Sequence, residues 1–446
     1  MKKWLMLVLC ACVASMEAMN AQCVGKWQGE LEVAGNKMPL VVRVASSKKA
    51  WMDSPKQMAM NIVCDTVSVS DEKITVGVRR MGILISGDIS KDDNGINGTF
   101  TQGYARLPFS MKYISNNPYL ERPQTPVPPF DYKCEDVTFS HGDVKLTGEL
   151  TMPKNIDKDI TAVVLVSGSG QQNRDSEMLG HRPFLVLADY LTRNGIAVLR
   201  YDDRGMGESS KCPIDATTND FAEDALAAVK YLRTVKGINQ KKVGIIGHSE
   251  GGMIAMMLAA EYPDEVNFIA TMAAPTIKGK DLIMRQTIDV AKSNGMAFTD
   301  EKIKMYEKVY SSIDTITDID KMRNVIYNTL SDGLSPQEMV SINSQIIMLT
   351  TPWYINFVQY NPAECIAKIK QPVLAMYGAN DVQVNDKVNS EALQTLYKGK
   401  KLTLKDYDNL NHLFQECEAP TADYGNIEQT ISPAMMHDLL NWLIER

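Results

Sequence analysis

Two different patterns of apolar and polar positions divide the chain. From about residue 22 to residue 115, short runs alternate apolar and polar side chains, and Gly, Asn, Asp, Ser or Pro residues end each run. Alternation with a period of two is typical of half-buried strands. The first part of the chain is therefore predicted to be a small antiparallel β domain, such as a partial barrel, with a structural or substrate-guiding role. We expect its strands at residues 29–33, 40–44, 66–69, 74–78, 83–89 and 109–113.

Beyond this domain the pattern changes. Residues 116–130 contain Pro118, Pro123, Pro126, Pro128 and Pro129 and are predicted to form an extended linker. From residue 131 onward, continuous apolar runs alternate with helical patterns, which is typical of an α/β domain with a doubly wound, mostly parallel sheet. A hairpin is expected at residues 137–151. The expected strands are residues 162–166, 197–201, 243–246, 268–272, 372–377 and 402–407, and the expected helices are residues 184–192, 221–232, 253–262 and 434–444.

The alternation stops between about residues 276 and 362. Helical patterns follow one another there, at residues 281–294, 300–312, 318–330 and 336–348, and the stretch ends in an aromatic segment at residues 352–357. We interpret residues 276–362 as a helical cap inserted into an α/β domain that extends from residue 131 to residue 446.

Composition excludes some classes of partner. The chain of 446 residues has a net charge of −7, so a basic face for nucleic acid or an anionic membrane is not expected. Two lysines and an apolar run at residues 4–14 resemble a secretory signal, and this run is too short to span a bilayer. We expect a signal peptide at residues 1–21 and an exported protein, periplasmic or extracellular. Attachment as a lipoprotein through Cys10 or Cys12 is the weaker alternative, because the preceding residues match a lipid-attachment box poorly.

The cysteines do not indicate a metal site. Two of the eight lie in the predicted leader, and the other six could pair in an oxidising compartment in ways that the sequence does not distinguish. The chain has no C-x-x-C, H-E-x-x-H or phosphate-binding G-x-x-x-x-G-K-[ST] motif. Neither a metal nor a cofactor is expected, and the oligomeric state is not predicted.

A nucleophile motif stands at the centre of the α/β pattern. The strand at residues 243–246 leads into Gly247-His248-Ser249-Glu250-Gly251, and helix-forming residues follow. This G-x-S-x-G sequence between a strand and a helix is the context of a nucleophile elbow, in which a serine sits on a strained turn. The alternative is a glycine-rich turn with an incidental serine. We expect Ser249 to be a nucleophile and the amide of Glu250 to face a developing oxyanion.

A serine nucleophile requires a base and a carboxylate that orients the base, in the chain order Ser, Asp or Glu, His. His412 follows the strand at residues 402–407, and it alone among five histidines has this order and context. Asp381 follows the preceding strand and is the expected carboxylate, with Asp408 as its competitor. The predicted triad is Ser249, His412 and Asp381. The other four histidines are predicted to be structural or solvent-facing: His141, His181, His248 and His437.

The loop at residues 167–175 is expected to complete the oxyanion hole. Its small residues follow the strand at residues 162–166 and allow a close approach of backbone to substrate. Ser169 is the first choice of amide donor, with Gly170 and Gln171 as alternates. A dinucleotide-binding role is excluded because Asn173 stands where the third glycine belongs.

Several neighbouring side chains have two interpretations. Arg204, and with it Arg174 and Asp175, could contact substrate, but we favour ion pairs that hold loops in place. The aromatic residues of the predicted cap either form its core or line an acyl pocket over Ser249. They are Trp353, Tyr354 and Phe357.

These motifs together resemble the α/β-hydrolase superfamily, and most closely the two-domain bacterial carboxylesterases of the EstD type. That group carries a β-rich N-terminal domain, an S-G-S-G…R-D loop, a D-D-R-G segment and a helical cap. Here the loop is residues 167–175 and the segment lies within residues 201–209. The resemblance spans residues 131–446, whereas the N-terminal domain matches only in position and class. It implies an α/β-hydrolase fold and a carboxylesterase.

The expected function is that of a secreted serine hydrolase that cleaves small-molecule carboxylic esters through an acyl-enzyme. Glu250 within G-H-S-E-G-G is shared with some peptidase-like relatives, so a serine peptidase of the prolyl-oligopeptidase or aminopeptidase kind is the alternative. The N-terminal domain is too short for the β-propeller that prolyl oligopeptidases commonly carry. A non-catalytic binding protein on a hydrolase fold is a third hypothesis, disfavoured because all three triad residues are present.

Overall fold

The structure is a computed structural model and describes residues 25–33, 36–57, 59–70, 72–90, 94–115, 122–154, 159–293, 295–296, 298–331, 336–422 and 424–446. The predicted leader, Cys23 and the first part of the predicted linker lie outside these residues. The chain divides into two compact units. The smaller holds the described residues of Met1–Pro123 together with Met178–His181 and Asp423–Glu428, and the larger holds the rest.

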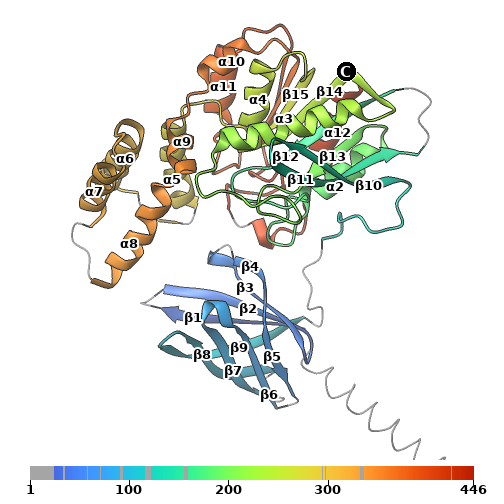
Figure 1. Ribbon diagram of the computed structural model, residues 1–446. Coiled ribbons are helices and arrows are strands. Elements are labelled where there is room, and N and C mark those ends of the chain that lie inside the picture. Colours follow the sequence, from blue (N-terminus) through green and yellow to red (C-terminus); the bar gives the residue numbers. More distant parts are fainter. Residues whose placement is uncertain are drawn as a thin grey trace, which may run out of the picture. The chain divides into compact units, whose positions relative to one another are not determined.

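The smaller unit is built on one antiparallel sheet of nine strands (Figure 1). Its strand order is β4-β3-β2-β1-β9-β8-β7-β6-β5, so β4 and β5 form the two edges. Trp27 is 1% exposed and packs in the core of this unit, edge-on to Tyr113. The strands are β1 (Gly25–Val33), β2 (Asn36–Ser46), β3 (Lys49–Ser54), β4 (Ala59–Val63), β5 (Thr66–Val69), β6 (Lys73–Val78), β7 (Ile83–Ser90), β8 (Gly95–Gln102) and β9 (Ala105–Ser115).

Three of these strands, β3, β4 and β8, were not predicted. Strand β8 contains two glycines and an asparagine, which are poor strand formers, yet it pairs with β7 on one side and β9 on the other. Gly98 is required there, because a Cβ atom on it would lie 2.1 Å from the carbonyl oxygen of Ser86. Sheet pairing therefore overrides local propensity in this strand.

The larger unit contains a mixed sheet of eight strands in the order β10-β11-β13-β12-β14-β15-β16-β17. The neighbouring strands β13, β12, β14, β15, β16 and β17 are parallel to one another. The hairpin of β10 and β11 adds two strands at one edge, where β11 pairs with β13 in the antiparallel direction. The strands are β10 (Tyr132–His141), β11 (Val144–Pro153), β12 (Ile160–Val166), β13 (Ala197–Tyr201), β14 (Ile238–His248), β15 (Phe268–Met272), β16 (Val373–Gly378) and β17 (Leu402–Tyr407).

Helices cover both faces of this sheet (Figure 1). Four of them pack side by side along one face, and two pack together on the other. The first group is α3 (Thr218–Thr234), α4 (Glu250–Glu261), α10 (Ala363–Lys368) and α11 (Asp386–Leu396), and the second is α2 (Pro183–Arg193) and α12 (Pro433–Ile444). The central strands are almost fully buried between them, as the continuous apolar runs predict.

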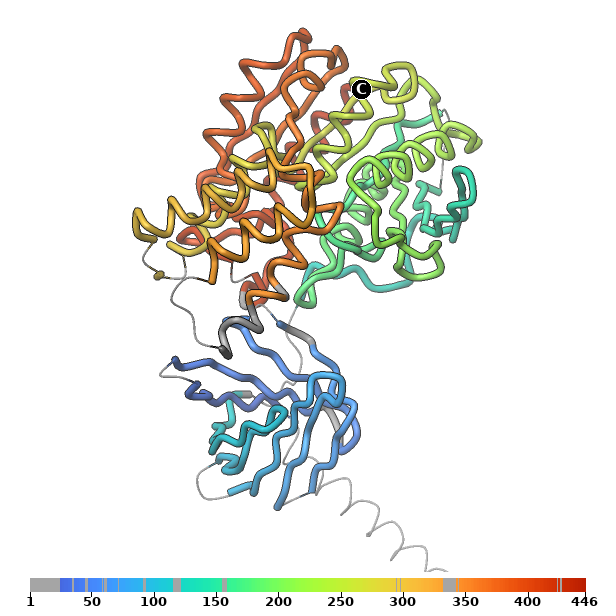
Figure 2. The backbone as a smooth tube through the Cα atoms, turned by 60° about the vertical axis from the view of Figure 1, so that its left-hand side comes forward, coloured from blue at the N-terminus to red at the C-terminus, as the bar shows by residue number. Residues whose placement is uncertain are grey.

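Six helices of the described chain lie between β15 and β16. The last of them, α10, packs against α4, and the first five form the group that Figure 2 traces in yellow and orange beside the sheet. They have an apolar core of their own, which includes Val309, Ile313 and Ile326. The helices are α5 (Gly279–Ser293), α6 (Asp300–Thr315), α7 (Ile319–Leu330), α8 (Pro336–Leu349) and α9 (Pro352–Gln359). In the part of the chain that the structure describes, no helix combines the length and apolar character needed to cross a bilayer.

Candidate active site

Ser249 lies on the turn between β14 and α4. Its backbone has φ 54° and ψ −118°, a left-handed conformation that is strained for a residue with a side chain. The turn is tight: a Cβ atom on Gly247 would lie 2.1 Å from the carbonyl oxygen of Gly251, and one on Gly251 would lie 2.2 Å from that of Val166. The amide of Ser249 also donates to the carbonyl oxygen of Met272 on the neighbouring strand, at 2.8 Å. These contacts hold the strained turn in place.

Asp381 and His412 meet through the loops that follow two adjacent parallel strands, β16 and β17. His412 Nδ1 lies 2.7 Å from Asp381 Oδ2, and both side chains are buried, with 4% and 5% of the residues exposed. The other carboxylate oxygen, Oδ1, accepts hydrogen bonds from the amides of Gln383 at 2.7 Å and Val384 at 2.9 Å. Asp408, the competing carboxylate, is exposed. The structure thus brings His412 to Asp381.

His248 connects the elbow to the histidine loop. Its Nε2 donates to the carbonyl oxygen of His412 at 2.9 Å, and the two imidazole rings lie 4.7 Å apart between centroids. Burial, reinforced by the neighbouring His412, lowers the pKa of His248 to about 3, so this ring is neutral. The residue before Ser249 therefore fixes the backbone of His412 beside the elbow.

The loop after β12 lies directly against the elbow. A Cβ atom on Gly168 would lie 3.1 Å from Ser249 Cβ and 3.4 Å from the carbonyl oxygen of His248. Gly170 has φ +91°, a conformation that favours glycine. Ser169, the expected amide donor, stands between these two glycines and is exposed. The predicted oxyanion residues of this loop are therefore close to the predicted nucleophile.

Asp203 closes the first part of this loop, from Ser167 to Gln172. Its Oδ2 accepts hydrogen bonds from the Ser167 hydroxyl group and the Gln172 amide, each at 2.9 Å, and its own amide donates to the Gln172 carbonyl oxygen. Burial raises the pKa of Asp203 to about 7, despite these hydrogen bonds. This role was not predicted, although Asp203 stands in the D-D-R-G segment.

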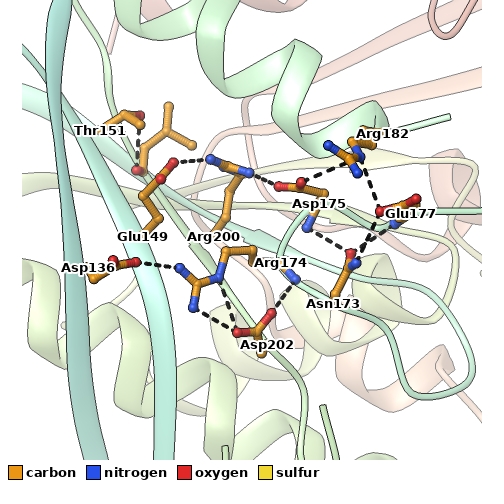
Figure 3. Close-up of polar contacts among 11 residues, drawn as sticks. Asp136, Glu149, Thr151, Asn173, Arg174, Asp175, Glu177, Arg182, Arg200 and Asp202 are labelled. Atoms are coloured by element: carbon orange, nitrogen blue, oxygen red, sulfur yellow. Dashed lines mark hydrogen bonds and ion pairs between the residues drawn. The ribbon is translucent and has the colours of Figure 1, made fainter. Parts of the chain in front are cut away.

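Ion pairs hold the far end of the loop, as Figure 3 shows. Arg174 lies between Asp202 and Asp136, with distances of 2.8 and 2.7 Å. Arg200, which is 2% exposed, bridges Asp175 and Glu149. The scaffolding interpretation of Arg174 and Asp175 is therefore favoured over substrate contact.

Arg204 has the same scaffolding role. It is 4% exposed, and its Nε lies 2.6 Å from Asp224 Oδ2 on α3. His141 Nε2 lies 2.7 Å from the other oxygen of Asp224, which makes this histidine structural.

The two remaining histidines differ in exposure. His181 is fully buried just before α2, with its Nε2 facing the Tyr424 carbonyl oxygen. Burial lowers the pKa of His181 to about 4. His437 is exposed on α12.

The three aromatic residues of α9 differ in their surroundings. Phe357 is 5% exposed and belongs to the main core, and Tyr354 packs against the core of the inserted helices. Trp353 is half-buried, and its Nε1 donates to Glu250 Oε1 at 2.8 Å. Packing thus favours the core interpretation for Phe357 and Tyr354, whereas Trp353 reaches the residue that follows Ser249. Nothing in the motif predicted a role for the Glu250 side chain.

Two other features bear on chemistry. The cysteines within the described residues, Cys64, Cys134, Cys212, Cys365 and Cys417, are free thiols. Among the described residues, no group of three or more His, Cys, Asp or Glu side chains is placed to hold a metal ion.

Comparisons with known proteins identify the family of the chain. Residues 181–418, more than half of the chain, match the hydrolase family described as serine aminopeptidase, S33. Esterase EstD of Thermotoga maritima is 24% identical over 324 residues, which cover 72% of this chain and 69% of that protein. The bifunctional esterase/perhydrolase DCH of Acinetobacter calcoaceticus is 22% identical over 52% of this chain and 80% of that protein.

The comparison with solved structures found Est1E of Butyrivibrio proteoclasticus with bound ferulic acid, among others. It is 19% identical, with a TM-score of 0.43 and coverage of 69% of this chain and 98% of that one. The family match includes Ser249, Asp381 and His412. The chain therefore belongs to the hydrolase family described as serine aminopeptidase, S33, has the α/β-hydrolase fold, and is a hydrolase.

Proposed function

We propose that this protein is a serine carboxylesterase that acts on small-molecule esters through a triad of Ser249, His412 and Asp381. One observation carries the proposal. The His412 ring is bonded through Nδ1 to the buried Asp381, while the His412 backbone is held by His248, the residue before Ser249. A serine, an aspartate and a histidine in this chain order are the parts of an α/β-hydrolase triad.

The chemistry follows from which atoms are already engaged. Because Asp381 occupies Nδ1, the Nε2 atom of His412 is the one that takes the proton from Ser249 as Oγ attacks the ester carbonyl carbon. The resulting oxyanion accepts hydrogen bonds from the amide of Glu250 and from the loop after β12, with Ser169 as first choice. His412 then returns the proton to the departing alcohol, and an acyl-enzyme remains.

Water completes the cycle. His412 removes a proton from a water molecule, which attacks the acyl carbon and forms a second oxyanion. As this intermediate collapses, the bond from the acyl carbon to Ser249 Oγ breaks and His412 gives its proton to Oγ, which restores the hydroxyl group and releases the carboxylic acid. No step requires a metal or a redox cofactor.

Esters are favoured over peptides as substrates because EstD and DCH are both named as esterases. The description of the family as serine aminopeptidase favours the alternative, a serine peptidase. A panel of nitrophenyl esters of increasing acyl length, assayed beside aminoacyl nitroanilides, separates the two. Faster turnover of the nitroanilides would assign the protein to the peptidases.

A fluorophosphonate probe tests the nucleophile directly. We expect the probe to label the protein, and the adduct to map to the peptide that contains Ser249. Ser249→Ala should abolish labelling and lower kcat by about 10⁶, as in other serine triads. Ser140→Ala, which changes an exposed serine on β10, is the matched control. If the probe does not label the protein, the third hypothesis, a non-catalytic binding protein, is favoured. If it labels another serine, the active site lies elsewhere.

A further inference from the structure

The side chain of Glu250 joins three segments that are far apart in the sequence. It is 2% exposed, and its Oε1 accepts hydrogen bonds from the Thr218 hydroxyl group at 2.6 Å and from Trp353 Nε1 at 2.8 Å. The Ser169 side chain interacts with the same carboxyl group and lowers its pKa. One side chain thus connects the start of α3, the inserted helix α9 and the loop after β12 to the nucleophile elbow.

These partners are neutral. Among the described residues, no lysine, arginine or histidine forms an ion pair with Glu250, and burial raises its pKa. Burying a carboxyl group without a cation is unfavourable unless hydrogen bonds satisfy its oxygens. Thr218 and Trp353 are therefore held strongly to Glu250, because moving either donor removes a hydrogen bond from a buried carboxyl group.

A role in binding a charged substrate amine fits the geometry poorly. Glu250 and Asp203 line a pocket of about 20 Å³ behind the oxyanion loop. This volume accommodates about one water molecule. A substituted ammonium group is larger, so Glu250 is not free to receive one there.

The hydrogen bond between Glu250 and Trp353 affects the surface that Trp353 can offer to a substrate. Its indole ring packs against Phe357, with 5.5 Å between ring centroids, and against Tyr354 at 6.0 Å. The ring is only half-buried, and its nitrogen is fixed to the residue directly after Ser249. The hydrogen bond therefore sets where the exposed part of the indole lies relative to the nucleophile.

We propose that Glu250 is a positioning residue, whose side chain holds Trp353 of the inserted helices as the wall for the acyl group and Ser169 in the oxyanion loop. The inference rests on the proposed function, since it assigns acyl preference at the same site. Glu250 acts through these neighbours, and its side chain does not take part in proton transfer.

The experiment is a double-mutant cycle on acyl preference. The ratio of kcat/KM for nitrophenyl octanoate to that for nitrophenyl acetate is measured in the wild type, Glu250→Leu, Trp353→Phe and the double variant. Glu250→Leu removes the acceptor, and Trp353→Phe removes the donor while keeping an aromatic ring. We expect Trp353→Phe to alter the ratio about tenfold, the effect of losing one hydrogen bond. Glu250→Leu, which also releases Thr218, should alter it in the same direction and at least as much. The double variant should differ little from Glu250→Leu.

Two further variants separate positioning from general damage. Glu250→Gln keeps an acceptor oxygen for Trp353 and should restore the ratio to near the wild-type value. Trp442→Phe is the matched control on α12, because its indole nitrogen is buried without a hydrogen-bond partner among the described residues. It should leave the ratio unchanged. If Glu250→Leu does not fold, the contrast between Trp353→Phe and Trp442→Phe still decides.

Three outcomes would overturn the inference. The effects of the two single changes on the ratio could be independent, Trp353→Phe could leave the ratio unchanged, or Trp442→Phe could change it equally. Fluorophosphonate labelling of the same samples keeps the two proposals apart. A wild type that is not labelled contradicts the serine esterase itself. A labelled wild type without coupling contradicts only the role of Glu250.

Discussion

At the scale of single residues, Asp381 uses its two carboxylate oxygens for different tasks. Oδ1 accepts two backbone amides from its own turn, and Oδ2 accepts from His412. The first pair of hydrogen bonds fixes the orientation of the carboxylate. The remaining oxygen then fixes the ring orientation and the tautomer of His412, which the proposed mechanism requires.

Asp381→Asn tests this assignment. The amide has nearly the same shape, but it can present an N–H to Nδ1 and so favour the wrong tautomer of His412. We expect kcat to fall by about 10⁴, as in other triads, with little change in KM. Asp408→Asn is the control, because Asp408 is the competing carboxylate in the sequence and is exposed. Steady-state kinetics with nitrophenyl acetate measure both. A large loss in Asp408→Asn instead would transfer the orienting role to Asp408.

The residues of the proposed triad could be selected from the sequence because each follows a strand in a fixed order. The surrounding contacts could not. Glu250 and Trp353 are 103 positions apart, and Asp203 and Gln172 are 31 apart, so only the folded sheet brings them together. A buried glutamate after the nucleophile carries no periodic signal, and its hydrogen bonds depend on side chains from three other elements.

At the scale of elements, the loop after β12 is the most heavily supported segment of the site. Asp203 closes its first part, and ion pairs of Arg174 and Asp175 anchor its second part (Figure 3). Such anchoring keeps backbone donors in place before the substrate arrives, which is the physical basis of oxyanion stabilisation. The cost is a buried carboxyl group whose ionisation opposes folding.

Asp203→Asn should reveal that cost as a pH-dependent stability. Burial raises the pKa of Asp203 to about 7, whereas an exposed aspartate titrates near pH ~3.9. Between these values the folded protein keeps a proton that the unfolded chain has lost, so the stability contributed by this group falls as the pH rises towards 7. Asn cannot ionise and still offers one acceptor oxygen. We therefore expect Asp203→Asn to have a higher melting temperature than the wild type at pH 8. The increase should be roughly 2–4 °C for each kcal/mol by which the substitution raises the free energy of unfolding.

The same comparison at pH 5 should show a smaller difference or none. Thermal unfolding followed by circular dichroism at both pH values measures it. Asp264→Asn, an exposed aspartate after α4, controls for the loss of one negative charge. Equal stabilisation at both pH values would mean that Asp203 is ionised in the fold at pH 5 as well.

Most elements of the larger unit were predictable, and the exceptions have physical causes. Strands β13, β15 and β17 begin and end as predicted. The first two are buried along their whole length, whereas β17 is a half-exposed edge strand with alternating apolar and polar residues. Helix α11 was not predicted, although Asn385 is a good N-cap and its side chain accepts from the Val388 amide. Polar residues on its buried face, such as Asn389, obscure the helical pattern: Asn389 is 0% exposed because its side chain and carbonyl oxygen bond Thr276.

At the scale of the whole molecule, the two compact units have separate apolar cores. One is centred on Trp27 and the nine-stranded sheet, and the other on the eight-stranded sheet and its helices. Every residue of the proposed active site belongs to the larger unit. A chain with two cores need not unfold in one step, since each core can lose its packing independently.

Cavity-forming substitutions in the two cores provide the test. Ile85→Ala in β7 and Leu187→Ala in α2 each remove a side chain that is at most 1% exposed. Each should lower the stability of its own unit by about 2–5 kcal/mol. Calorimetry should then show one transition shifted by Ile85→Ala and another shifted by Leu187→Ala. Only Leu187→Ala should lower the temperature at which esterase activity is lost, because the catalytic groups depend on the larger core. A single transition that both substitutions shift equally, together with the loss of activity, would show that the two units unfold as one.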